Sequence, residues 1–226
     1  MTRIRGSLNS QGALPLSLAP TPASVFVGRS NQAAVAAVLE RAWTGALYLE
    51  GPPKSGKSHL AAVFAARAGA ARVAAAELDA ERAAQLADIG AVAIDGLESL
   101  RPGGEEALFH LFNAILRQNG QLLLTGRVPP RGLSVALKDL ATRLHSVPVA
   151  RIGPPDERDL EGLLTRLAEA RQLALPPPVL AYLLPRMPRT HAAAINLMEA
   201  LDRLSLETGC ALSRELAAEA LKTAET

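Results

Sequence analysis

The segment 51–58, GPPKSGKS, constrains the fold of this chain more than any other part of its sequence. It matches the pattern G-x-x-x-x-G-K-[ST] in full, with Gly51, Gly56, Lys57 and Ser58 at the defined positions. In such a pattern the glycines let backbone N–H groups surround phosphate oxygens, the lysine neutralises the phosphates, and the hydroxyl can bind Mg²⁺. A strand must precede the loop and a helix must follow it, and GALYLE (45–50) and KSHLAAVFAARAGA (57–70) meet both requirements. We therefore predict a phosphate-binding loop rather than a Gly/Pro turn with a solvated lysine.

Four further short apolar runs are expected to be strands: 71–78, 90–95, 120–126 and 146–152. Helical stretches separate them, and an alternation of strands and helices is typical of a parallel sheet covered on both faces. The predicted fold class is therefore α/β, with a five-stranded parallel sheet and helices on both of its faces.

The strands stop at about residue 153, and we expect three helical segments beyond it, divided by prolines at 176–178 and at 185 and 188. Leucines at helical spacing mark the first and the last of these segments. The chain thus divides into a tail (1–20), a nucleotide-binding α/β subdomain (21–152) and a small all-helical subdomain (153–226).

A carboxylate for the Mg²⁺ shell is expected at the end of a strand beside the loop, and Asp95 closes the apolar run AVAID. Ser58 and Asp95 are therefore the candidate metal ligands. Many P-loop ATPases place a second acid directly after this aspartate to activate water, but this chain has Gly96. Its own hydrolysis is expected to be weak, with Glu98 either a substitute base or a solvated loop acid.

Composition narrows the class of protein but names no partner. The 226 residues are 49% hydrophobic and 3% aromatic, with a formal charge of +2, one cysteine and four scattered histidines. Few aromatic residues and no basic run disfavour a nucleic-acid-binding surface, and a lone cysteine excludes an internal disulfide. No signal peptide or membrane-spanning run is evident in the sequence, so a cytoplasmic location is expected.

The N-terminal tail contains one stretch that does not fit a solvated segment, QGALPL at 11–16. Pro15 favours an extended conformation at Leu14, which projects Leu14 and Leu16 to the same side, with Gln11 available for a hydrogen bond. The stretch is either a docking motif for a transient partner, an edge strand on the chain's own core, or a chance pattern.

Taken together, these motifs resemble the AAA+ domain of the DnaA family of replication initiators, and within that family the Hda group. The resemblance covers residues from about 25 to the C-terminus and rests on FVGRSN, GPPKSGKSHL, AIDGLESL, LFHLFNAILRQNGQLLLTGRVPP and LKDLATRL. It implies an AAA+ fold in which the C-terminal helices form a lid over the nucleotide.

The resemblance also implies roles for particular residues in binding ADP or ATP with Mg²⁺. Val27 and Gly28 would lie beside the adenine. The phosphates would lie against the whole loop, Gly51, Pro52, Pro53, Lys54, Ser55, Gly56, Lys57, Ser58 and His59.

Three positions that would act on the phosphates follow from the same comparison. Thr125 corresponds to the sensor 1 residue, and Arg143 to the arginine finger that acts in trans on a neighbouring subunit. At the sensor 2 position this chain has Ala192, so that either Arg189, one turn earlier, reaches the nucleotide or the sensor is absent. Arg127 stands where an acid often follows the sensor 1 glycine.

The function that this resemblance implies is negative regulation of replication initiation. The chain would bind a nucleotide, with ADP favoured, dock through Gln11, Leu14, Pro15 and Leu16 on the DNA polymerase sliding clamp, and promote hydrolysis of DnaA-bound ATP. A homodimer is possible, and sequence-specific DNA binding is not implied. Three alternatives remain open: a clamp or initiator tether that does not stimulate hydrolysis, a helicase-loader-type ATPase, and a small P-loop kinase.

Overall fold

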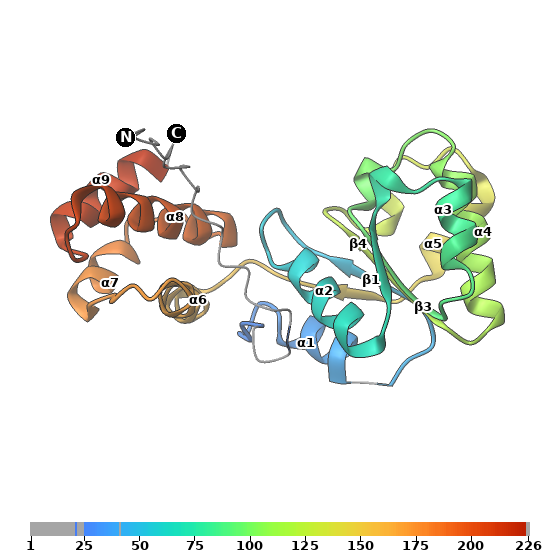
Figure 1. Cartoon of the computed structure of the whole chain (residues 1–226), viewed down its shortest axis with the longest axis horizontal. Helices are drawn as coiled ribbons and strands as arrows, with labels where there is room; N and C mark the ends of the chain where they lie inside the picture. The colour runs from blue at the N-terminus through green and yellow to red at the C-terminus, as the bar shows by residue number, and fades with distance from the viewer. Residues whose placement is uncertain (1–20, 22–24, 41, 225–226) are drawn as a thin grey trace, which may run out of the picture.

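The structure of the protein, a computed structural model, describes residues 21, 25–40 and 42–224 (Figure 1). The motif at 11–16 lies outside the described residues, so its proposed docking role is carried by the sequence alone.

The described strands form one five-stranded sheet in the order β2-β3-β4-β1-β5, and every neighbouring pair is parallel. The predicted α/β fold class is thus confirmed. Two strands are shorter than expected, because a 3₁₀ turn (η3, Ala75–Glu77) replaces the end of the second and β5 pairs over three residues. The strands are β1 (Gly45–Glu50), β2 (Ala71–Ala74), β3 (Ala91–Asp95), β4 (Gln121–Gly126) and β5 (Val149–Arg151).

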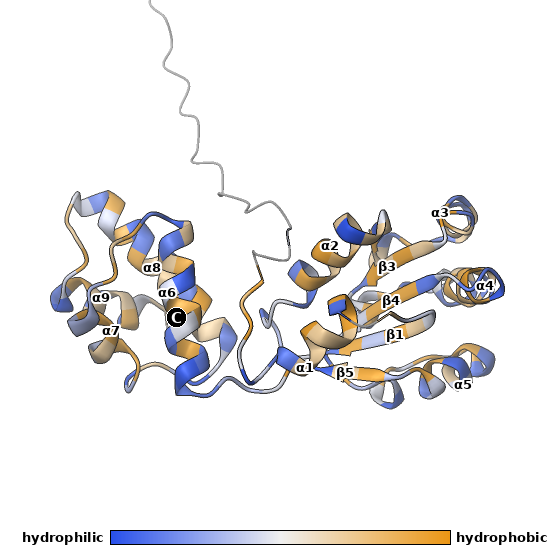
Figure 2. Cartoon of the chain, turned by 90° about the horizontal axis from the view of Figure 1, so that it is seen from below, coloured by the Kyte–Doolittle hydropathy of each residue, from blue (hydrophilic) through white to orange (hydrophobic). Residues whose placement is uncertain are grey.

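Successive side chains of the central strands enter opposite cores, as the two-residue period of a strand requires. Leu47 and Leu49 pack in one core and Tyr48 in the other, and Leu122 and Leu124 lie opposite Leu123 in the same way. Figure 2 shows the helices in two layers on either side of the sheet. One layer holds α1 (Gln32–Val35), the π-helical turn η2 (Ala36–Glu40) and α2 (Lys57–Ala68), and the other holds α3 (Ala80–Leu86), α4 (Gly104–Arg117) and α5 (Lys138–Ser146).

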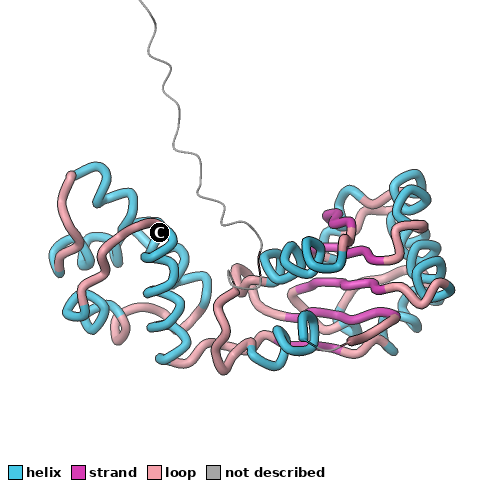
Figure 3. Tube along the Cα trace, turned by 60° about the horizontal axis from the view of Figure 1, so that its bottom comes forward, coloured by secondary structure: helices cyan, strands magenta, loops and turns pink. Residues whose placement is uncertain are grey.

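The C-terminal part is helical and has a hydrophobic core of its own. Among the described residues it contains four helices rather than the three expected, because the last predicted segment is broken at Gly209. Gly209 ends its helix with a φ of +65°, a left-handed conformation that glycine adopts without steric cost. The helices are α6 (Glu157–Ala170), α7 (Pro177–Leu183), α8 (His191–Thr208) and α9 (Arg214–Ala224), and Figure 3 shows them set apart from the sheet.

No described helix combines the length and apolar character needed to cross a membrane. No group of three or more His, Cys, Asp or Glu side chains within the described ranges is arranged to hold a metal ion.

Candidate nucleotide-binding site

The sheet order brings the sequence motifs to one edge. Since all five strands are parallel, the carboxyl ends of β1, β3 and β4 lie together, with β4 between the other two. The loop 51–56 leaves β1, Asp95 ends β3, and Thr125 is the last residue but one of β4. This is the edge at which ligands bind in open α/β sheets.

The phosphate loop is shaped by its backbone and by one lysine. Gly56 has a φ of +91° and Lys54 a φ of +56°, both left-handed, so the chain curls before it enters α2. Lys57 is buried, and its Nζ donates hydrogen bonds of 2.7 Å to the carbonyl oxygens of both Gly51 and Pro52. Burial lowers the pKa of Lys57, while the nearby carboxylate of Glu98 opposes that shift. An anion beside this ammonium would therefore favour its charged form.

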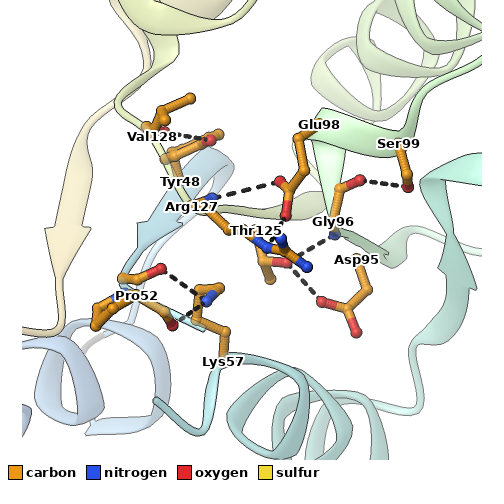
Figure 4. A network of polar contacts seen from close by, with 11 residues as sticks. Tyr48, Pro52, Lys57, Asp95, Gly96, Glu98, Ser99, Thr125, Arg127 and Val128 are labelled. Carbon is orange, nitrogen blue, oxygen red and sulfur yellow. Dashed lines mark hydrogen bonds and ion pairs between the residues drawn. The ribbon is translucent and has the colours of Figure 1, made fainter. Parts of the chain in front are cut away.

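Asp95 and Thr125 are joined directly at the ends of β3 and β4. The fully buried Thr125 hydroxyl donates to Asp95 Oδ1 at 2.5 Å and accepts a hydrogen bond of 2.9 Å from the Gly96 backbone N–H (Figure 4). Thr125 therefore fixes the Asp95 carboxylate and the turn that follows it. Asp95, together with the exposed Ser58 in the first turn of α2, provides the oxygen donors that Mg²⁺ prefers.

A cavity of about 880 Å³ lies between the phosphate loop and the helical subdomain. Its walls come from the segment 25–35 that includes α1, from the loop with the start of α2, from Ile152 after β5, and from helices α6 and α8. The apolar part of the lining includes Val25, Phe26, Leu60, Ile152, Leu163, Leu167 and Ile195. An apolar wall next to a phosphate loop suits a ligand with a flat base at one end and charge at the other.

Three buried polar atoms within the described residues have no hydrogen-bond partner, and all three belong to residues that line this cavity. They are Ser55 Oγ, Arg166 Nε and His191 Nδ1. A buried polar atom without a partner costs free energy unless a ligand or water satisfies it. The cavity therefore offers two donors or acceptors from the lid and one from the loop to a polar ligand, and Ser55 is among the residues expected there.

Two of these three residues, Arg166 and His191, were not predicted from the sequence to line the site. His191 is 4% exposed at the start of α8, and burial lowers its pKa although the Asp159 carboxylate opposes the shift. Arg166 lies on α6. The only sequence signal for His191 is its place directly after Thr190, whose hydroxyl caps α8, and no sequence signal distinguishes Arg166 from other surface arginines.

The segment directly after the residues expected beside the base is held by the helical subdomain. Asp159 on α6 accepts hydrogen bonds of 2.8 Å from the backbone N–H groups of Arg29 and Ser30. A side chain at Gly28 would lie 2.2 Å from Asp159 Oδ1, so only glycine fits this approach. Val27 is 57% exposed and does not line the cavity, whereas Val25 and Phe26 do.

The two predicted arginines lie away from this cavity. Arg189 is exposed, pairs with Glu157 at 3.3 Å and is not part of the cavity lining, so contact with a nucleotide requires it to leave Glu157. Arg143 is exposed near the end of α5, with its guanidinium carbon 6.0 Å from the centre of the Phe112 ring. It is thus on the sheet face opposite α2, free of its own chain's phosphate loop.

Similar arrangements are found in solved structures of the replication initiator DnaA and of RuvB. The chain is similar to domain III of the replication initiator DnaA from Thermotoga maritima, with 21% identity over 93% of this chain and 98% of that one and a TM-score of 0.78. It is also similar to DnaA bound to AMPPCP and single-stranded DNA, with 17% identity, 92% and 82% coverage and a TM-score of 0.64. A third similar structure is the Thermotoga maritima RuvB Holliday junction branch migration motor, with 16% identity, 87% and 70% coverage and a TM-score of 0.66.

The fold and the phosphate loop together define the class: the chain has the fold of AAA+ proteins. Residues 156–214, which include α6, α7 and α8, match the family described as "Hda, lid domain". The helical subdomain is thus similar to the Hda lid domain, and the resemblance to the Hda group of DnaA-like proteins is confirmed.

Proposed function

We propose that this protein is a nucleotide-binding regulator of replication initiation that promotes hydrolysis of ATP held by DnaA. The observation that carries nucleotide binding is the group of three unpartnered atoms, on Ser55, Arg166 and His191, around one cavity beside the phosphate loop. When bound, Mg²⁺ would neutralise phosphate charge between Ser58 and Asp95. The chain's own residues would hold the phosphates at Lys57 and close the lid over the base.

Nucleotide binding is tested by titrating fluorescent ADP and ATP analogues into the wild type and Lys57→Ala. Removing the ammonium that would bind the phosphates should weaken nucleotide binding by at least tenfold, since charge-assisted hydrogen bonds contribute about 1.5–3 kcal/mol. Lys222→Ala, an exposed lysine in the last turn of α9, is the matched control. Equal affinities for all three proteins would rule out the loop as the binding site.

Arg143 would act on the nucleotide of a neighbouring molecule rather than on its own. Its exposure on α5 and its distance from its own loop's cavity support a role in trans. An arginine finger contributes roughly 10³–10⁵ in rate, which corresponds to about 4–7 kcal/mol of barrier. The lack of an acid at Gly96 does not affect this activity, because the attacking water and the metal belong to the partner's site.

The arginine-finger role is tested by measuring hydrolysis of DnaA-bound ATP in the presence of the DNA-loaded clamp. Arg143→Ala should lose at least a hundredfold of the stimulation while it still binds nucleotide, and Arg214→Ala on α9 serves as the matched control. Full stimulation by Arg143→Ala would contradict the proposal. If Arg143→Ala still blocks initiation without stimulating hydrolysis, the protein is a tether.

Docking on the sliding clamp is proposed through Gln11, Leu14, Pro15 and Leu16, in the stretch that the structure does not describe. A pull-down of the clamp by the wild type and by a variant lacking residues 11–16 tests it. A second variant with Leu14→Ala and Leu16→Ala separates the two apolar side chains from the length of the tail. Equal capture by all three proteins would place the contact elsewhere.

A further inference from the structure

The turn after β3 carries an acidic side chain toward the end of β4. Gly96 has a φ of +77°, and the chain then forms the 3₁₀ turn η4 (Leu97–Ser99), in which Leu97 is buried. Ser99 Oγ donates to the Gly96 carbonyl at 2.7 Å, and Gly96 N–H donates to Thr125. These two hydrogen bonds hold the turn that carries Glu98.

Both oxygens of the Glu98 carboxylate are engaged by a single residue. Arg127 Nε lies 2.9 Å from Glu98 Oε1, and the Arg127 backbone N–H donates to Oε2 at 3.3 Å. Figure 4 shows the Glu98–Arg127 pair next to Thr125, in the same group of side chains as Asp95 and Lys57. Glu98 and Arg127 both influence the pKa of Lys57, which places the pair within electrostatic reach of the phosphate loop.

We propose that Glu98 is the water-activating carboxylate of this site and that Arg127 holds it inactive. This inference rests on the proposed binding of ATP at the loop. In the reaction, the oxygen of a water attacks the γ-phosphorus, the bond to the β-phosphate oxygen breaks with release of ADP, and Glu98 accepts the water's proton. Arg127 is a positioning residue, because its two N–H donors occupy the oxygens that would otherwise accept that proton.

The ion pair between Arg127 and Glu98 is weak enough to be broken when another ligand binds. The Arg127 side chain is 61% exposed and that of Glu98 29% exposed, and ion pairs at this degree of exposure are weak. A ligand or partner that offers Arg127 another anion would release Glu98. Until such an anion binds Arg127, the protein would keep its ATP unhydrolysed. Hydrolysis would begin only after Glu98 is released.

The test measures ATP turnover and nucleotide affinity for Arg127→Met, Arg127→Lys and the double variant Arg127→Met/Glu98→Gln. Arg127→Met keeps the length of the side chain but removes both the charge and the Nε donor, so kcat should rise on the order of 10²-fold with KM unchanged, the lower end of what a positioned base contributes. Arg127→Lys, which restores the charge, should stay within a few fold of wild type. The double variant should return to the wild-type rate, and Lys57→Ala sets the baseline.

The possible results separate this inference from the proposed function. If the wild type binds no nucleotide, both fail. If Arg127→Met binds ATP normally and its kcat does not rise, only the inactivation by Arg127 is overturned. A raised kcat that persists in the double variant would exclude Glu98 as the base, and a selective loss of ATP affinity in Arg127→Met would identify Arg127 as a phosphate ligand instead.

Discussion

The Asp159 carboxylate on α6 accepts hydrogen bonds of 2.8 Å from the backbone N–H of Ser30, 129 residues earlier in the chain, and from that of Arg29. The Asp159 side chain is 3% exposed, and its own N–H is bonded to Asp156 at the helix start. Burial alone would raise the pKa of Asp159, but the hydrogen bonds from Ser30, Arg29 and Asp156 outweigh it and lower the pKa. The lid is thereby attached to the segment that precedes α1.

Replacing Asp159 with alanine should weaken this attachment. The change leaves two backbone N–H groups without their charged acceptor, so we expect the free energy of unfolding to fall by about 2–4 kcal/mol. Urea denaturation at pH 7 measures it, with Asp88→Ala, an exposed position, as the control. Because the folded pKa is below the unfolded one, the contribution is present above about pH 4 and is lost as pH falls further. Equal stabilities of the two variants at pH 7 would contradict the assignment.

His191 should make the protein less stable in mild acid. Burial lowers the pKa of His191 below the usual histidine value of about 6.5. Between these two pKa values the unfolded chain binds a proton that the folded chain does not. The free energy of unfolding should therefore fall as pH drops below about 6.5, by at most about 1.4 kcal/mol per pH unit from this group.

The comparison of His191→Asn with wild type isolates this effect from the other titrating groups. Unfolding by urea between pH 7.5 and 5.5, without nucleotide, should show a smaller decrease for His191→Asn than for wild type. His110→Asn, at an exposed position on α4, should keep the wild-type slope. A wild-type slope in His191→Asn would mean that the imidazole is solvated in the folded protein.

The local features of the site were predictable because short-range chemistry determines them. The loop 51–58, the strand that ends at Asp95 and the threonine at the end of β4 each depend on glycine placement or on a buried apolar run. The contacts between the lid and the rest of the chain were not predictable. From helical periodicity alone, Asp159 and His191 would be ordinary surface or core positions of their helices. Only the folded chain brings them next to the residues before α1.

One fold feature was missed for a related reason. The break between α8 and α9 follows from the left-handed φ of Gly209, yet a single glycine in an Ala- and Leu-rich sequence also occurs inside helices. The core around Leu212, Leu216 and Ala217 fixes the second helix in place. That packing information is not contained in the local sequence.

Lys54 should be more tolerant of glycine than of alanine. Its Nζ contacts Asn196 Oδ1 at 2.5 Å and Glu199 Oε2 at 3.6 Å on α8, and either substitution removes these contacts equally. Only alanine, which has a Cβ atom, is destabilised by the left-handed φ of +56°. We expect Lys54→Gly to be the more stable by about 0.5–1 kcal/mol in thermal or urea unfolding, after the larger entropy of unfolded glycine is included.

The same pair of substitutions at Lys138, in the first turn of α5, should give the opposite order, because alanine is the better helix former. If alanine were favoured at both positions, the left-handed turn would not be a property of the phosphate loop in solution.

Gly126 should not tolerate a methyl group while Tyr48 keeps its hydroxyl. A Cβ at Gly126 would lie 1.8 Å from the Tyr48 OH and 2.8 Å from its ring carbon Cζ. The hydroxyl cannot easily move, since it donates to the Val128 carbonyl at 2.7 Å. Gly126→Ala should therefore lower the free energy of unfolding by about 3 kcal/mol, at the upper end of the usual cost of overpacking. Gly132→Ala, where the nearest atoms are 3.5 Å away, is the control.

Tyr48→Phe should rescue part of this loss. Alone, Tyr48→Phe removes the hydrogen bond to Val128 and should lower the free energy of unfolding by about 1 kcal/mol. In combination with Gly126→Ala it also removes the oxygen atom that the new methyl group would approach most closely. The double variant should thus be more stable than the sum of the single changes predicts, with a coupling of about 1 kcal/mol or more in a double-mutant cycle. Additive effects would show that the Tyr48 hydroxyl does not lie against Gly126 at the end of β4. In that case the positions of Arg127 and Glu98, which follow from the same strand end, would also have to be revised.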